Sequence, residues 1–190
     1  MKALRPQLSL VVGICLITLG LTASTANAQS VCLPAPRLLT TMPMGGQAGT
    51  TFEIKIAGED IDDAEELNFS HPGITAEPKL DKNGLPIANQ YVVTIAKDCP
   101  VGVHEARVMT RLGLSTSRAF NVGDLTEAVQ TPGKNDSLEA AMQLDLNSIC
   151  NAIMTSRKID YYTFEAKEGQ RVVVDCAAKG IDSKLNPVVI

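Results

Sequence analysis

Residues 51–57 have the sequence Thr51-Phe52-Glu53-Ile54-Lys55-Ile56-Ala57, in which apolar and polar side chains alternate. Successive side chains of a β-strand point to opposite faces, so this two-residue period predicts a half-buried strand. Phe52, Ile54 and Ile56 then share the face that points into the core. The flanking sequence continues the pattern, since three further stretches are rich in β-branched and apolar residues: Tyr91–Ala96, Val103–Leu112 and Ser115–Val122.

Turn signals separate these predicted strands. Asp81-Lys82-Asn83-Gly84 contains the Asn-Gly pair that is typical of a tight hairpin turn, and Gly113 joins two of the later strands. About seven strands fit between Arg37 and Val122 at the strand lengths usual in small β-domains. The predicted fold class is all-β, with residues 29–122 forming an immunoglobulin-like sandwich of two antiparallel sheets.

The first 28 residues predict an export signal rather than a folded element. Lys2 and Arg5 supply a positive start, Leu8–Leu21 is an apolar stretch, and Ala26-Asn27-Ala28 is a cleavage motif. The stretch is shorter than the roughly 20 residues that a spanning helix needs, which disfavours the alternative of an uncleaved anchor. We therefore expect a secreted, periplasmic or cell-surface protein with no membrane span after signal cleavage.

Composition narrows the possible partners. The chain of 190 residues carries 17 Lys and Arg against 21 Asp and Glu, a formal charge of −4. Cleavage removes two cations and no acid, which leaves 15 − 21 = −6. This net negative charge provides no electrostatic attraction for nucleic acid, so we expect no nucleic-acid partner. Aromatic residues make up only 4% of the chain and Trp is absent, which disfavours an aromatic surface on which sugar rings could stack. An extracellular protein or a polysaccharide remains as the expected partner.

Four cysteines remain after cleavage, and an exported chain favours their pairing. Four cysteines allow three pairings. Cys32–Cys99 and Cys150–Cys176 would each close a loop within one predicted module, so we expect that pairing. The alternative is four free thiols. A zinc site is disfavoured, because no C-x-x-C motif or pair of histidines lies near these residues.

Residues 123–134 predict a linker, and residues 135–190 predict a second β-module. One or two helical turns over Ser137–Leu144, capped by Asp136, precede three expected strands. These strands are Tyr161–Phe164, Arg171–Cys176 and Pro187–Ile190. An apolar strand at the end of the chain would leave unpaired backbone groups. We therefore expect this module to be truncated and to continue beyond Ile190.

Residues 36–122 resemble the TIG/IPT family of immunoglobulin-like domains. The resemblance rests on Pro43-x-Gly45-Gly46-x-x-Gly49-Thr50 before the strand at Phe52, and on Pro100-x-Gly102-x-His104 with Phe120-x-Val122 later. It implies a binding, spacer or adhesion module, although a fold by itself settles no activity.

Residues 135–190 resemble the first half of the bacterial pre-peptidase C-terminal domain. The matching motifs are Asn135-Asp136-Ser137, Asp160-Tyr161-Tyr162-Thr163-Phe164 and Ala166-Lys167-x-Gly169-Gln170. The resemblance implies a partial β-sandwich of jelly-roll type with an accessory role. The tandem of the two modules is similar to that in large secreted proteins of planctomycete-type bacteria.

Some relatives of this second family hold calcium, and the resemblance implies Asn135, Asp136 and Asp160 as ligands here. Calcium takes six to eight oxygen ligands, whereas this sequence offers three beside the cations Arg157 and Lys158. The alternative is that Asp136 caps a turn and Asp160 bonds to the backbone. Beyond this calcium possibility, we expect no cofactor.

The sequence contains few groups that support catalysis. His71 and His104 are the only histidines available as a base. A Cys99/His104 pair is conceivable as a thiol nucleophile, but strand residues five apart point to opposite faces. The common hydrolase and nucleotide-binding motifs are absent. We therefore expect non-catalytic binding or spacer modules rather than an enzyme. The alternative is the accessory N-terminal region of a secreted peptidase whose catalytic domain lies outside this chain.

Overall fold

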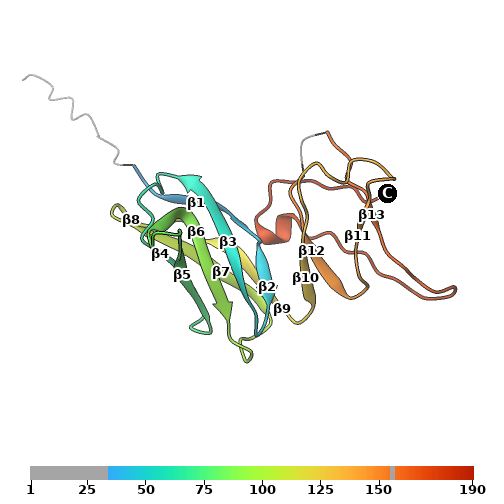
Figure 1. Cartoon of the computed structure of the whole chain (residues 1–190), viewed down its shortest axis with the longest axis horizontal. Helices are drawn as coiled ribbons and strands as arrows, with labels where there is room; N and C mark the ends of the chain where they lie inside the picture. Colours follow the sequence, from blue (N-terminus) through green and yellow to red (C-terminus); the bar gives the residue numbers. More distant parts are fainter. Residues whose placement is uncertain (1–33, 155–156) are drawn as a thin grey trace, which may run out of the picture. The chain divides into compact units, whose positions relative to one another are not determined.

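A computed structural model describes residues 34–154 and 157–190 (Figure 1). Contacts divide the chain into two units, Met1–Leu33 and Pro34–Ile190, and the described residues all belong to the second. The predicted export signal over residues 1–28 and the predicted disulfide partner Cys32 therefore lie outside the described residues. We call residues 34–123 the two-sheet module and residues 124–190 the C-terminal segment.

The first sheet of the two-sheet module has four antiparallel strands in the order β1-β3-β6-β5. Their bounds are β1 Arg37–Met42, β3 Thr51–Glu59, β6 Pro86–Ile95 and β5 Ile74–Leu80. The stretch around Ile54 is confirmed as a strand at the centre of this sheet, where Ile54 pairs with Tyr91 of β6.

The second sheet contains five strands, with the order β2-β9-β7-β4 and β8 paired to β7. Their bounds are β2 Gly45–Gln47, β4 Glu66–Phe69, β7 Gly102–Thr110, β8 Gly113–Leu114 and β9 Arg118–Gly123. All pairs are antiparallel except β2 with β9, which is parallel. The parallel pairing of β2 with β9 and the short strands β2 and β8 differ from the two wholly antiparallel sheets of about seven strands that the sequence predicts.

The two sheets share one hydrophobic core. Ile54, Val93 and Ile95 enter it from the first sheet, and Val108 and Phe120 enter it from the second. Phe120 has no exposed surface. Its ring lies parallel to that of Phe52 at 6.5 Å and tilted against that of Phe69 at 4.8 Å. Burial of both apolar faces in one core confirms the all-β fold class.

The hairpin turn between β5 and β6 is confirmed at residues 81–84. The N–H of Gly84 donates to the carbonyl of Asp81 at 3.1 Å. Gly84 has a φ of 79°, in the region where a glycine avoids the strain of a side chain. The carboxylate of Asp81 accepts from the N–H groups of Asn83 and Leu85, which lowers the pKa of Asp81. This turn fixes the register of the two strands.

Each outer strand of the two sheets is short or irregular. β2 has three residues and β4 has four, while β1 has a register shift between Leu38 and Thr40. The pairing of β5 is interrupted between Pro78 and Leu80. Such features limit pairing with a further strand of another molecule. The two-sheet module therefore does not present a long, flat edge.

The C-terminal segment contains two short parallel strand pairs. β10 (Thr126–Val129) pairs with β12 (Ser148–Asn151), and β11 (Met142–Gln143) pairs with β13 (Tyr162–Thr163). The first of these strands lies within the stretch 123–134 that the sequence predicts to be a linker. The only helix in the described residues is the 3₁₀ turn η1 (Lys179–Ile181), and none of the described helical structure is long and apolar enough to cross a membrane.

Several local predictions for this segment are wrong. The strand expected over Tyr161–Phe164 is reduced to β13, and the strands expected over 171–176 and 187–190 do not form. Residues 171–176 and 187–190 pair with no strand of the described residues, and Val173 is 79% exposed. A strand is stable only when its backbone is paired and one face is buried.

The one or two helical turns expected over residues 137–144 do not form a helix. A single turn forms instead, in which the N–H of Ala140 donates to the carbonyl of Ser137. Isolated helices of this length are unstable without tertiary packing. Leu138 is 74% exposed, so no apolar face anchors a helix here.

Replacement of Phe120 by Ala should destabilise the two-sheet module strongly, because it leaves a cavity between the sheets. Fully buried Phe to Ala changes cost about 3–5 kcal/mol. Urea unfolding followed by circular dichroism measures this loss. Val103→Ala is the control, since Val103 is 60% exposed and should change stability little. Equal effects of the two substitutions would contradict the shared core.

Candidate functional site

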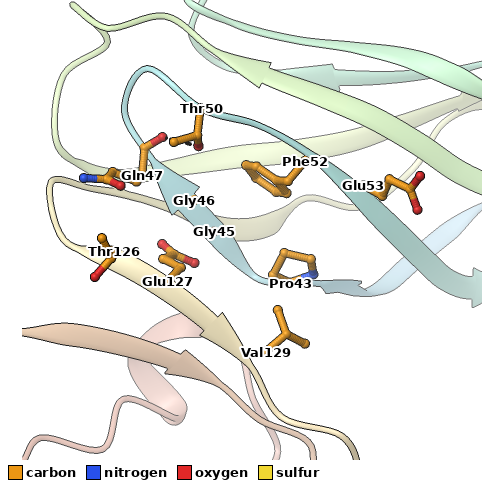
Figure 2. Close-up of a pocket in the computed structure, with 10 residues that line it drawn as sticks. All are labelled: Pro43, Gly45, Gly46, Gln47, Thr50, Phe52, Glu53, Thr126, Glu127 and Val129. Carbon is orange, nitrogen blue, oxygen red and sulfur yellow. Dashed lines mark hydrogen bonds between the residues drawn. The ribbon is translucent and has the colours of Figure 1, made fainter. Parts of the chain in front are cut away.

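A groove runs between the β2–β3 region and β10 (Figure 2). Its volume is about 300 Å³. The side chains of Pro43, Phe52 and Val129 form its apolar part, and Glu53 and Glu127 contribute carboxylates. A second hollow of about 290 Å³ shares Pro43, Glu53 and Val129 with the first. The two hollows therefore adjoin each other, and together we call them the β2–β10 groove.

Two glycines shape the wall that β2 contributes to this groove. A Cβ atom on Gly45 would collide with the carbonyl of Asn121 on β9, and one on Gly46 would collide with the ring of Phe52. The missing side chains let β2 lie against its neighbours in the second sheet and let the Phe52 ring approach it. The Gly45-Gly46 pair is therefore required by close packing rather than by positive φ.

Glu127 is the partly buried carboxylate of the groove. Its Oε2 atom accepts a hydrogen bond from the side-chain amide of Asn151 at 2.6 Å. Its Oε1 atom is buried and has no hydrogen-bond donor among the described residues. Burial raises the pKa of Glu127, and the Asn151 hydrogen bond only partly opposes this shift. Figure 2 shows this carboxylate turned from β10 toward β2.

The side-chain amide of Asn151 also links Glu127 on β10 to the segment that leads into β2. The Oδ1 atom of Asn151 accepts a hydrogen bond from the backbone N–H of Met44 at 3.1 Å. Asn151 thus holds Glu127 on one side and the start of β2 on the other. These two hydrogen bonds of Asn151 fix the position of the Glu127 carboxylate in the groove.

Glu53 differs from Glu127 because a cation already satisfies it. The Nζ atom of Lys79 lies 2.6 Å from Oε2 of Glu53, whose side chain is well exposed. Water and Lys79 share the charge of this carboxylate. Of the two carboxylates that line the first hollow, only Glu127 has a buried oxygen without a hydrogen-bond donor among the described residues.

No sequence motif marks this groove. Glu127 and Val129 lie in the stretch that predicts a linker, and Asn151 lies in no recognised motif. Met44 and Asn151 are 107 residues apart, so no local pattern announces their contact. The glycine pair at 45–46 was the one available signal that another part of the chain approaches closely.

The structure brings together two of the three residues predicted to bind calcium. Nε2 of Gln130 donates to Oδ1 of Asn135 at 2.6 Å and to Oδ2 of Asp160 at 2.9 Å. Asn135 is almost completely buried, whereas Asp136 is exposed. The described residues hold no group of three or more His, Cys, Asp or Glu side chains arranged for a metal ion. The calcium site stays a prediction. In the structure the side-chain amide of Gln130 lies between the oxygens of Asn135 and Asp160.

The Cys99 thiol contacts His71 rather than the partner considered from the sequence. Its Sγ atom lies 3.6 Å from Nδ1 of His71, which also accepts the N–H of Gly73 at 3.0 Å. His104 instead hydrogen-bonds the carbonyl of Pro100 through Nε2 at 2.8 Å. Burial, and then the charge of Asp98, raise the pKa of Cys99. The thiol form is therefore favoured, which is the opposite of what a nucleophile needs.

The predicted disulfide between Cys150 and Cys176 is not formed in the structure, where both are free. Cys150 is half-buried on β12 with its sulfur 4.0 Å from that of Met142, whereas Cys176 is exposed in an unpaired stretch. Cys99 is buried and forms no disulfide with another cysteine of the described residues. Its predicted partner Cys32 lies outside the described residues, so that pairing stays a prediction.

Comparison with protein-family models, with curated proteins and with solved structures finds no match for this chain. The two family resemblances of the sequence analysis therefore stay predictions, and the site is interpreted from its geometry.

In the folded chain, iodoacetamide should alkylate the exposed Cys176 first and Cys99 last, because burial limits access to Cys99 and raises its pKa. Intact-mass and peptide mass spectrometry over a time course measures the order, and the denatured chain is the control. Rapid alkylation of Cys99 would contradict its buried contact with His71. A mass two daltons low at Cys150 and Cys176 would instead restore the disulfide.

Replacement of Glu127 by Gln should stabilise the chain at neutral pH. The folded pKa of Glu127 is raised, so the wild type loses stability as pH rises from the ordinary value of 4.5 through the folded value. Gln keeps an oxygen for Asn151 but never ionises. Melting midpoints from pH 3 to pH 8 measure the difference, which should vanish in acid. A difference that does not change with pH would contradict the assignment.

Proposed function

We propose that this chain is a non-catalytic binding part of an exported protein, located in the periplasm, on the cell surface or in the medium. Residues 1–28 act as its export signal. Residues 29–122 form an immunoglobulin-like module, and residues 135–190 belong to an accessory module of the pre-peptidase C-terminal type. The observation that carries the binding role is the β2–β10 groove.

The groove supports binding because it combines apolar surface with a few fixed polar groups. Sites for ligands are concave and mostly apolar, with polar groups that set orientation. Pro43, Phe52 and Val129 supply the apolar part, and Glu127 is held in place by Asn151. The opening between β2 and β10 suits an elongated ligand that lies along the surface.

The contacts of Cys99 argue against a thiol-dependent reaction. A catalytic cysteine needs a lowered pKa and access to substrate, whereas Cys99 is buried and its pKa is raised. Nδ1 of His71 accepts the N–H of Gly73, so it is not free to act as a base. These contacts support a structural role for both residues.

Export is tested by expressing the full chain in a Gram-negative host and fractionating the cells. The expected product is exported and begins at Gln29, as measured by intact mass and N-terminal sequencing. Substitution of Ala28 by a bulky residue should block cleavage, because signal peptidases require small residues at this motif. A full-length product that stays in the cytosol would overturn the proposal.

Binding is tested by probing the exported chain on an array of random twelve-residue peptides and purified extracellular polysaccharides. Val129→Asp should abolish binding, since it places a second acid in the apolar part of the groove. Val103→Asp is the matched control, because Val103 and Val129 are 60% and 52% exposed and only Val129 lines the groove. Retained binding by Val129→Asp would remove the groove from the proposal.

A further inference from the structure

The stretch Arg171–Cys176 has the composition of a strand but no strand beside it. It contains three consecutive valines, and its backbone forms no hydrogen bonds with other described residues. Figure 1 draws it as a coil rather than an arrow. Val173 and Val174 are 79% and 62% exposed. Unpaired backbone groups and exposed valines together form a surface that another strand can cover.

The charges of this stretch are arranged so that it complements a second copy of itself. Arg171 and Asp175 lie at equal distances in sequence from Val173, one on each side. Both are exposed, and neither forms an ion pair with a described residue. Residues four apart in a strand are separated by about 13 Å, so these two charges cannot neutralise each other within one chain.

We propose that residues 170–176 of two copies of the chain pair as antiparallel strands around a two-fold axis at Val173. In this register Arg171 of each copy lies opposite Asp175 of the other, and the valines of the two copies lie opposite one another. Opposite charges and β-branched side chains in directly facing positions stabilise an antiparallel pair. Both copies use the same surface, which is the arrangement of a two-fold symmetric dimer.

Other pairings are less well matched. An in-register parallel pair would place Arg171 beside Arg171 and Asp175 beside Asp175, and like charges in facing positions are destabilising. The antiparallel pair ends where the chain turns, at residues 167–170 on one side and at η1 on the other. The second unpaired apolar stretch, Pro187–Ile190, contains no charged side chain, so nothing in its sequence selects a second copy.

The pairing is expected to be weak and reversible. It involves one short segment of each chain, and a two-stranded sheet is only marginally stable by itself. Exposed ion pairs contribute little each and are screened by salt. The pairing does not use the residues that line the β2–β10 groove. Its failure would therefore leave the proposed binding function intact.

Sedimentation velocity of the purified exported chain at low salt tests the pairing between about 10 μM and about 1 mM, the range of weak association. The wild type should shift reversibly from monomer to dimer. Arg171→Glu should weaken this association about tenfold, because by symmetry it places acids opposite acids at two positions. Asp175→Arg should weaken it similarly by placing cations opposite cations. Lys82→Glu is the matched control for Arg171→Glu, since it changes the net charge equally in an exposed turn of the two-sheet module.

An equimolar mixture of the two variants gives the sharpest readout. When an Arg171→Glu chain pairs with an Asp175→Arg chain, opposite charges face each other again at both positions. The mixture should therefore form heterodimers with an affinity near that of the wild type, and native mass spectrometry identifies them by mass. The double variant Arg171→Glu/Asp175→Arg should likewise associate with itself. Loss of folding cannot produce such a rescue.

Four results would overturn the inference. A wild type that stays monomeric would leave residues 171–176 to a strand of another protein. A dimer that neither single substitution weakens would place the contact between copies on another surface. Equal weakening by Lys82→Glu would reduce the effect to net charge. A mixture of the two variants that does not associate would contradict the antiparallel register.

Discussion

The packing of two sheets around Phe120 is the constraint on which the other features depend. Its ring contacts those of Phe52 and Phe69, so it fixes the spacing between the sheets. Phe52 in turn requires a glycine at position 46, because a side chain there would meet its ring. The core therefore sets the position of β2, and β2 forms one wall of the groove.

Polar contacts then position the C-terminal segment along this wall. Asn151 receives the N–H of Met44 and donates to Glu127, and the carboxylate of Asp182 accepts the N–H of Ala119 on β9 at 2.8 Å. These contacts are few and directional, in contrast to the extensive apolar burial of the two-sheet module. Burial raises the pKa of Glu127 at this junction, so its ionisation lowers the stability of the folded chain.

Much of the fold follows from local pattern. Alternation at Ile54 and Ile56 predicts both the strand and its buried face, and Asp81–Gly84 predicts the hairpin, because turn residues act through their own backbone. The same reasoning fails at 171–176, where three consecutive valines have high strand propensity but no partner to pair with in the structure. Propensity alone does not make a strand, since the backbone needs a hydrogen-bonded neighbour.

The sequence by itself determined that the chain is all-β, and it determined most strands of the two-sheet module, because burial in a sheet imposes a two-residue period that survives in the sequence. Only the tertiary structure decided that Cys99 contacts His71, that Gln130 stands between Asn135 and Asp160, and that Glu127 lines a groove with Pro43 and Phe52. Each of these depends on chain segments that meet only after folding. A contact between segments that are far apart in the chain produces no periodic pattern in the sequence of either segment.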